Sequence, residues 1–364
     1  MERAIDSLLA KAALMKASDI HFSSGEDPVV RINGNLVSFR DISLLLRCSD
    51  EGKDSERESV PKKETFVVSK PQVSLIGKDS ESFRLFEPIL PEKQRSMLEK
   101  DGECDFAYAL RTGQRFRINL YHSKGRLAAA VRVIPEKIPT CSELGMPDAV
   151  KRLSGLKSGL VLVTGATGSG KSTTLAAILN EINECRHVHI LTLEDPIEYN
   201  FTPVKSLIHQ REVGNDTASF ATGLRAALRE NPDIIMVGEL RDLESIAIAV
   251  TAAETGHLVF ATLHTRSAAD TVNRMIDVFP EQQQRQIRIQ LAGSLQAVVC
   301  QQLLPDKQGN RTAAFEVMIM IPALRTLIRE GKTQQIYSYI QTGSQYGMQT
   351  MKEAVEQLKW AGKI

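Results

Sequence analysis

The segment from Gly165 to Ser172, GATGSGKS, has residue types and spacing suited to binding a nucleoside triphosphate. It matches the pattern GxxxxGK[ST], with an apolar run before it and a helix-like run after it. Glycines let backbone N–H groups turn toward phosphates, Lys171 would reach the β and γ oxygens, and Ser172 would ligate Mg²⁺. The residues expected to hold ATP are Gly165, Thr167, Gly168, Ser169, Gly170, Lys171, Ser172 and Thr173.

Hydrolysis also needs an acidic group that orients the attacking water, usually at the end of a neighbouring apolar strand. Glu239 is the first carboxylate after the apolar run at 234–237, and Gly238 stands where an Mg²⁺-binding Asp is usual. Glu194 and Asp195 follow another apolar run and are candidates for the metal side. The alternative for Glu239 is a carboxylate that merely begins a helix.

Two histidines bracket the apolar run LVFATL, His257 before it and His264 after it. The carboxyl ends of strands in α/β sheets are where ligands bind, which makes His264 the stronger candidate to sense phosphate. A hydrogen-bonded structural histidine remains the alternative for both.

To act together, these residues must lie at one edge of a sheet, where the carboxyl ends of neighbouring strands meet. The runs GLVLVT, VHILTLE, DIIMVG and HLVFAT predict strands, and helical patterns at 171–184, 219–230 and 242–254 separate them. Such alternation favours an α/β fold with a mostly parallel sheet and helices on both faces. From Ser267 onward the pattern predicts helices with one β-like patch near 311–320.

The first part of the chain predicts a small α+β domain. Residues 2–17 form an amphipathic helical pattern, Asn33-Gly34 indicates a hairpin, and CDFAYAL, RFRINLY and RLAAAVRVI are strand-like. In RFRINLY, Arg115 and Arg117 share one face of a half-buried strand, which could equally be a solvated face. The charged segment at about 48–64 lacks apolar periodicity and is expected to be a mobile insertion.

Three prolines lie in the segment between the two parts of the chain. Pro135, Pro139 and Pro147 place a linker at 135–147. The predicted domains are therefore 1–134 and 148–364.

Composition narrows the possible partners of the chain. Of 364 residues, 42% are hydrophobic and 24% charged, and the net charge is +1, so no global field favours nucleic acid or anionic membrane. No apolar run approaches the ~18 residues of a membrane span, which predicts a cytoplasmic location without direct membrane insertion. The five cysteines form no CxxC pair and are expected to be free thiols.

Together these motifs resemble the type II/type IV secretion ATPase superfamily. The segments GATGSGKSTT, LTLEDPIEY, LRAALRENPDIIMVGELRD and TAAETGHLVFATLHT are similar to its Walker A, Asp box, Walker B and His box. The N-terminal ASDIHF and the C-terminal LIREGKTQQIYSYIQTGSQYGMQTM resemble its pilus retraction branch. The likeness covers nearly the whole chain apart from roughly 41–85, and Ala166 and Thr326 stand where the family usually has Pro and Asn.

The resemblance implies a PAS-like N-terminal domain and a RecA-like ATPase core with a helical C-terminal region. It implies a homo-hexamer with ATP at subunit junctions, which works with the pilus machinery and an inner-membrane platform protein at the inner face of the cytoplasmic membrane. It maps the water-activating base onto Glu239, the Asp-box acid onto Glu194 and the His-box histidine onto His264. It further implies arginines that act in trans on a neighbouring subunit's nucleotide, and the candidates are Arg115, Arg117, Arg126 and Arg132. The C-terminal helix would couple nucleotide state to pilus disassembly, with Arg325 and Arg329 on the side away from its buried stripe.

Three other functions are alternatives to pilus retraction. A pilus extension or type II secretion ATPase of the same superfamily commonly carries paired CxxC motifs after Walker B, where this chain has only Cys300. A RecA-like nucleic-acid motor would need a basic or aromatic face, yet aromatics are 5% of the chain. A non-hydrolysing scaffold is disfavoured by Glu239.

Overall fold

The computed structural model describes residues 3–32, 34–39, 84–307 and 309–364. The chain divides into two compact units, Met1–Glu136 and Lys137–Ile364. The division falls within the predicted linker, and Cys141 and Met146 of that segment are buried in the core of the second unit. The segment 48–64, expected to be a mobile insertion, lies outside the described residues.

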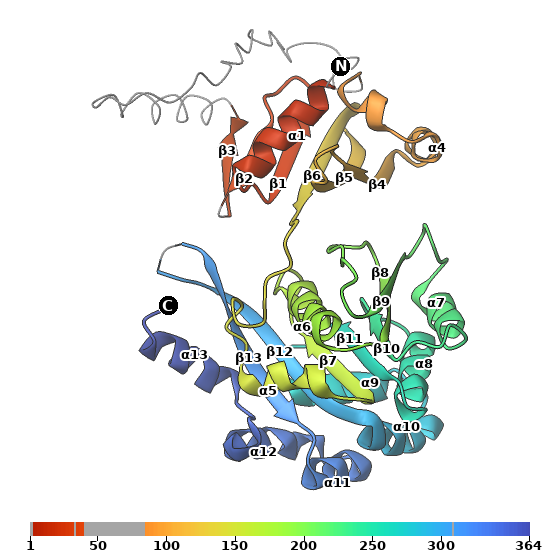
Figure 1. Cartoon of the computed structure of the whole chain (residues 1–364), viewed down its shortest axis with the longest axis vertical. Helices are drawn as coiled ribbons and strands as arrows, with labels where there is room; N and C mark the ends of the chain where they lie inside the picture. The colour runs from red at the N-terminus through yellow and green to blue at the C-terminus, as the bar shows by residue number, and fades with distance from the viewer. Residues whose placement is uncertain (1–2, 33, 40–83, 308) are drawn as a thin grey trace. The chain divides into compact units, whose positions relative to one another are not determined.

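The first unit is built on a six-stranded antiparallel sheet of order β3-β2-β1-β6-β5-β4. Its strands are β1 (Asp19–Ser23), β2 (Val29–Ile32), β3 (Asn35–Ser38), β4 (Glu103–Ala109), β5 (Arg115–Ser123) and β6 (Arg126–Ile134). Among the described residues, its helices include α1 (Ala4–Leu14), α4 (Glu92–Asp101) and the 3₁₀ turn η1 (Glu87–Ile89). Figure 1 shows α1 lying along this sheet. The three predicted β4–β6 strands, the N-terminal helix and the β2–β3 hairpin are confirmed.

One face of this sheet supplies the core of the first unit. Phe116, Ile118 and Leu120 of β5 are fully buried and pack in one cluster with Ile5 and Leu9 of α1. Because side chains alternate along a strand, the odd-numbered residues of β5, Arg115 and Arg117 among them, lie on the opposite face. The arginines of β5 belong to that opposite face.

The second unit contains a seven-stranded sheet of order β13-β12-β7-β11-β10-β8-β9, and only the β12–β13 pair is antiparallel. Its strands are β7 (Gly159–Thr164), β8 (His189–Glu194), β9 (Leu207–Glu212), β10 (Ile234–Val237), β11 (Leu258–Leu263), β12 (Leu295–Pro305) and β13 (Arg311–Ile319). Its α-helices are α5 (Asp148–Lys151), α6 (Lys171–Cys185), α7 (Phe220–Ala227), α8 (Leu243–Glu254), α9 (Ala268–Asp277), α10 (Glu281–Ser294), α11 (Pro322–Glu330), α12 (Ile336–Thr342) and α13 (Met351–Trp360), and its 3₁₀ turns are η2 (Arg152–Gly155), η3 (Thr333–Gln335) and η4 (Ser344–Tyr346).

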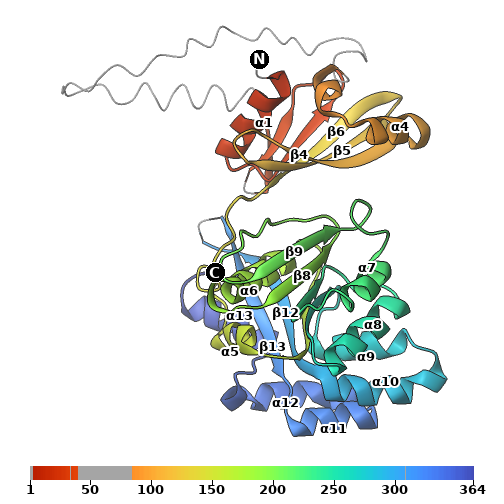
Figure 2. The same ribbon diagram turned by 45° about the vertical axis from the view of Figure 1, so that its right-hand side comes forward.

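Two apolar layers cover the faces of this sheet. On one face Leu160 and Leu162 of β7 pack with residues of α7 to α12, and on the other Val161 and Val163 pack with α5 and α6. Figure 2 shows α8, α9 and α10 grouped along the sheet. The predicted α/β fold, with a mostly parallel sheet covered on both faces, is confirmed.

Two strands of the second unit were not predicted. The expectation of helices with a single β patch after Ser267 is wrong, because 295–305 forms β12, a central strand between β7 and β13. The sequence of this strand is LQAVVCQQLLP. A short buried apolar run shows neither the helical nor the strand periodicity, so it cannot be assigned to either from sequence. The edge strand β9 (LIHQRE) was missed as well, since it mixes apolar and charged residues.

Within the part of the chain that the structure describes, no helix is long and apolar enough to cross a membrane. Four cysteines fall in the described ranges, Cys104, Cys141, Cys185 and Cys300, and all are free thiols as expected. Burial and the neighbouring Glu181 raise the pKa of Cys141 to about 12, so this thiol is protonated at neutral pH.

Candidate functional site

Four parallel strands of the second unit end at one edge of the sheet. The spatial order β7-β11-β10-β8 brings their carboxyl ends together, and the chain continues from them into the P-loop, His264, Glu239 and the end of β8. Register holds the ends level, since Leu263 lies opposite Thr164 and Val237 opposite Leu193. Because β11 lies between β7 and β10, the topology places His264 between the P-loop and Glu239.

The P-loop runs from the end of β7 into α6. Gly165 has φ +146, and a Cβ there would run into the Gln301 carbonyl oxygen and Ser169. Only glycine therefore allows the loop to leave the strand in this direction. Ala166, Thr167 and Gly168 are exposed at the turn, where backbone groups are available to a ligand.

Lys171 begins α6, and its ammonium group lies under the loop. Nζ donates to the carbonyl oxygens of Gly165 at 2.9 Å and Ala166 at 3.1 Å. Burial lowers the pKa of Lys171, while Glu239 and Glu198 oppose that shift. Ser172 follows on the exposed side of the first helical turn, and the Thr173 hydroxyl is 3.0 Å from that of Tyr199.

His264 bridges the two charged groups of the site. Its Nδ1 is 3.4 Å from Lys171 Nζ, and its Nε2 is 3.0 Å from Glu239 Oε1. An ammonium group can only donate, so Nδ1 accepts and the Nε2–H donates to Glu239. Lys171, His264 and Glu239 thus form one continuous chain of polar contacts, as their strand order requires.

Glu239 is held as a carboxylate. Burial alone would raise its pKa, but the hydrogen bond from Arg241 and the nearby His264 outweigh burial and bring the pKa below its usual range. Arg241 NH2 lies 2.7 Å from Glu239 Oε2. The Glu239 side chain is 17% exposed, so a small molecule at this edge of the sheet can reach it.

Gly238 occupies a crowded position between β10 and β8. A Cβ at this residue would stand 3.2 Å from the Leu193 carbonyl oxygen and 3.5 Å from Glu194 Cα. Contacts of that closeness leave little room for a longer side chain. The main chain of β8 thus passes close to this position.

Glu194 ends β8, and its side chain is bonded to β8 and β9. The residue is 7% exposed, and Oε1 accepts from Thr192 Oγ1 at 2.6 Å and Gln210 Nε2 at 3.0 Å. Burial raises the pKa of Glu194, partly offset by these two donors. Glu194 is thus fixed in one orientation beside β9.

His257 lies at the opposite end of β11 from His264. Its Nδ1 is 3.0 Å from the carbonyl oxygen of Ala252, near the carboxyl end of α8. The ring therefore helps terminate a helix. The structure does not bring His257 to the P-loop edge.

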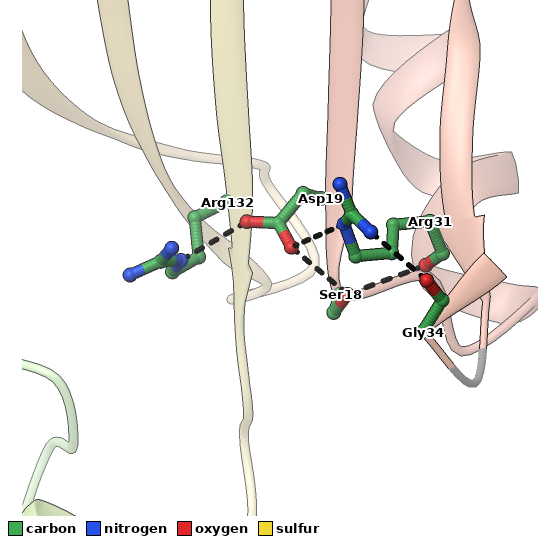
Figure 3. Close-up of polar contacts among 5 residues, drawn as sticks. All are labelled: Ser18, Asp19, Arg31, Gly34 and Arg132. Atoms are coloured by element: carbon green, nitrogen blue, oxygen red, sulfur yellow. Dashed lines mark hydrogen bonds and ion pairs between the residues drawn. The ribbon is translucent and has the colours of Figure 1, made fainter. Parts of the chain in front are cut away.

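The candidate trans arginines lie on one face of the sheet in the first unit. Arg117 and Arg132 are directly opposite each other on β5 and β6, and Asp19 on β1 is opposite Arg132. Arg132 Nε lies 3.1 Å from Asp19 Oδ1, and Figure 3 shows Arg31 on the other side of the same carboxylate. Arg115 is two residues along β5 from Arg117 and shares its face.

Arg126 is separated from this group. It begins β6, six residues before Arg132, and therefore lies about 20 Å from it along the strand. The structure thus brings Arg115, Arg117 and Arg132 together and leaves Arg126 at the far end of the face.

In the C-terminal helix α11, Arg325 and Arg329 differ. The expectation that Arg325 is left on the free side of the helix is wrong, because its guanidinium donates to the carbonyl oxygens of Ala292 and Gly293 at the end of α10. Those carbonyls have no partner within their own helix, so an arginine is well suited to them. Arg329 is exposed and contacts Thr326 within its own helix.

Several site residues have no counterpart among the predicted ones. Arg241, which holds Glu239, could have been found from its position two residues beyond that acid. Gln301 accepts from Thr174 of α6 at 2.6 Å and lies on the unpredicted β12. No sequence signal connects residues so distant in the chain.

A mostly parallel sheet with a P-loop at its carboxyl edge, and an acid on a nearby strand, defines a P-loop nucleotide-binding protein. The family model "Type II/IV secretion system protein" matches residues 114–360, and the chain belongs to this family. It is 45% identical over 360 residues to the type IV pilus retractation ATPase PilT of Pseudomonas aeruginosa, covering 99% of this chain and 95% of that protein.

Two further likenesses agree with that assignment. A twitching motility protein of Neisseria gonorrhoeae is 49% identical over 76% of this chain and 74% of its own length. A crystal structure of the pilus retraction motor PilT with bound ADP superposes with a TM-score of 0.83 at 43% identity, covering 100% of this chain and 95% of that one. The predicted superfamily is confirmed.

Proposed function

We propose that the chain is an ATP-hydrolysing motor that powers type IV pilus retraction by withdrawing pilin subunits. The observation that carries the chemistry is the contact chain from Lys171 through His264 to Glu239 at the P-loop edge. The pilus role is supported by near full-length similarity to a relative named as a retraction ATPase. ATP hydrolysis would supply mechanical work.

Each residue of the contact chain has a distinct role in this proposal. Lys171 binds the β and γ phosphates and stabilises the charge that shifts during transfer. Glu239, ionised at neutral pH, orients the attacking water and accepts its proton. His264 contacts both residues, so it would sense the γ-phosphate through Lys171 and transmit the change to Glu239 through its Nε2–H.

Mg²⁺ fits the oxygen groups at this edge, since it prefers hard oxygen ligands and keeps several waters. The exposed Ser172 hydroxyl would hold the ion, and Glu194, whose carboxyl is buried and already hydrogen-bonded, would hold one of its waters. Bound Mg²⁺ would neutralise charge on the β and γ phosphates.

The assembly we propose is a homo-hexamer with ATP between subunits. The first unit carries a face of arginines but no phosphate loop of its own, so its arginines would act on a neighbour's nucleotide. Arg115, Arg117 and Arg132 are the grouped candidates, and Arg126 is set apart by its position on β6. The ring would act on the pilus machinery through an inner-membrane platform protein at the cytoplasmic face.

Helix α11 would couple nucleotide state to pilus disassembly. Arg329 is its exposed cation, whereas Arg325 holds the end of α10. Arg329→Ala should therefore leave ATP turnover in vitro unchanged while cells fail to retract pili. Loss of turnover in proportion to loss of retraction would contradict a separate coupling role.

The direct test of motor direction is pilus number in a strain lacking the gene. Retraction predicts hyperpiliated cells that do not twitch, with normal numbers restored by the wild-type chain and not by Lys171→Ala. Bald cells would show an extension ATPase instead.

A further inference from the structure

A buried polar row runs across the sheet behind the site. Glu316 on β13 lies opposite Cys300 on β12, Cys300 opposite Thr164 on β7, and Thr164 opposite Leu263 on β11. Leu263 is the residue before His264, and Thr164 is the residue before the P-loop. The row therefore spans the two segments that the site must hold together.

The contacts along this row are hydrogen bonds between buried groups. Thr164 Oγ1 donates to Cys300 Sγ at 3.1 Å, and both residues are at most 1% exposed. Burial and Glu316 raise the pKa of Cys300 to about 12, so the thiol keeps its proton. Glu316, 4% exposed, accepts from the backbone N–H of Ala268 at 2.8 Å.

Ala268 is the first residue of α9, only four residues after His264. Its N–H is one of the four that a helix leaves unpaired at its start, and a carboxylate there is favoured by the helix dipole. A second bond closes the same turn, because the Thr265 and Thr271 hydroxyls are 2.7 Å apart. The turn that carries His264 is thus tied down at both ends.

The strand that bears Glu316 is itself held by the C-terminal region. Val317 exchanges two backbone hydrogen bonds with Gln349, at 2.9 and 3.2 Å, and the Gln349 side chain donates to the Phe315 carbonyl at 2.8 Å. The residues on either side of Glu316 are therefore fixed by the segment before α13.

We infer that Glu316 is a positioning residue for hydrolysis: it anchors the start of α9 and so sets the distance of His264 from Glu239 and Lys171. Its carboxyl group is buried and bonded to Ala268, so it would act through the turn that carries His264. The inference rests on the function proposed above, because it acts through His264.

The test is a double-mutant cycle between Glu316→Ala and His264→Ala, with kcat and KM for ATP measured for the full-length chain. Misplacing a catalytic group by about 1 Å can cost ~100-fold, so we expect Glu316→Ala to lower kcat by roughly 10- to 100-fold with KM unchanged. In the His264→Ala background it should cost nothing more. Glu316→Gln, whose amide oxygen can still accept from Ala268, should recover most of the activity.

A control is Glu143→Ala, before α5. Glu143 also accepts a backbone N–H, from Thr140 at 2.7 Å, but it lies outside this row and outside the segment that holds β13. Its kcat should match the wild type. If Glu316→Ala does not fold, Thr271→Val, which removes the bond to Thr265, should lower kcat and again be silent in the His264→Ala background.

The outcomes separate the two claims. An equal loss of kcat from Glu316→Ala in both backgrounds, or no loss in either, would overturn the positioning role. Wild-type turnover by His264→Ala would instead overturn the role proposed for His264.

Discussion

The carboxyl edge of the parallel sheet and the arginine face of the antiparallel sheet gather charged residues in different ways. At the edge, Lys171, His264 and Glu239 follow three different strands, and His264 contacts the other two. On the face, Arg132 and Arg117 contact nearby carboxylates, Asp19 and Asp105. Parallel strands that end together converge on one point, whereas an antiparallel face spreads its residues over rows. The edge joins its charged groups into one chain of contacts, whereas the face holds its cations in separate ion pairs.

The strongest test of the edge is Lys171→Ala. The ammonium group is aimed at the loop that would hold the phosphates, so we expect ATP hydrolysis to fall to background in a steady-state phosphate assay. Lys157→Ala, at an exposed lysine before β7, is the control and should retain full activity. Turnover at the wild-type rate in Lys171→Ala would sink the P-loop assignment.

Glu239→Gln separates binding from chemistry at the same edge. The amide keeps the shape but cannot accept the water's proton, so turnover should fall by about 10²- to 10⁴-fold. ATP affinity, measured with a fluorescent analogue, should stay near that of the wild type because the P-loop is untouched. Weakened binding with normal turnover would contradict the role of a base.

The two regions also differ in how far sequence could anticipate them. The edge was predictable because a parallel sheet needs only strand order and strand ends. His264 comes directly after an apolar run, and Glu239 comes one residue after another. Two supporting side chains near the edge were not predictable. Gln210, which bonds Glu194, and Gln301, which bonds Thr174, lie on β9 and β12, whose sequences lack a clear strand period.

The arginine face was predictable only in part. The alternation of side chains placed Arg115 and Arg117 on one face. Which arginine of β6 lies opposite them depends on the strand register, which sequence does not give. In the structure Arg117 is paired with Arg132, and Arg126 is paired with Ser123. Asp19 lies about a hundred residues earlier in the chain, and nothing local to Arg132 indicates it. Long-range register of this kind is set by packing of the whole sheet.

Mixed assemblies can show whether arginines of this face act on the nucleotide bound by a neighbouring subunit. Arg117→Ala and Arg132→Ala should each lower turnover, and an arginine acting on a transferring phosphate contributes ~10³ to 10⁵ in rate. Mixing either variant with Lys171→Ala should restore activity at hybrid junctions, while Arg126→Ala should behave as wild type. Absence of rescue in confirmed mixed rings, for every arginine of the face, would argue against action in trans.

The smallest expected effect is the stability of the arginine face itself. Asp19→Asn removes the carboxylate shared by Arg132 and Arg31, at 3.1 and 3.9 Å. The Arg132 side chain is 64% exposed, so water and salt screen the pair, and ion pairs of this kind contribute about 0–1 kcal/mol. Urea unfolding of Asp19→Asn should therefore show a free energy of unfolding lower by at most ~1 kcal/mol, and the difference should shrink at high salt. Ser18→Ala, which removes a neutral contact to the same carboxylate, is the control and should show no such salt dependence. A loss of several kcal/mol that persists in high salt would mean that Asp19 organises the fold of the first unit, and that its arginines are structural cations rather than cations presented to a partner.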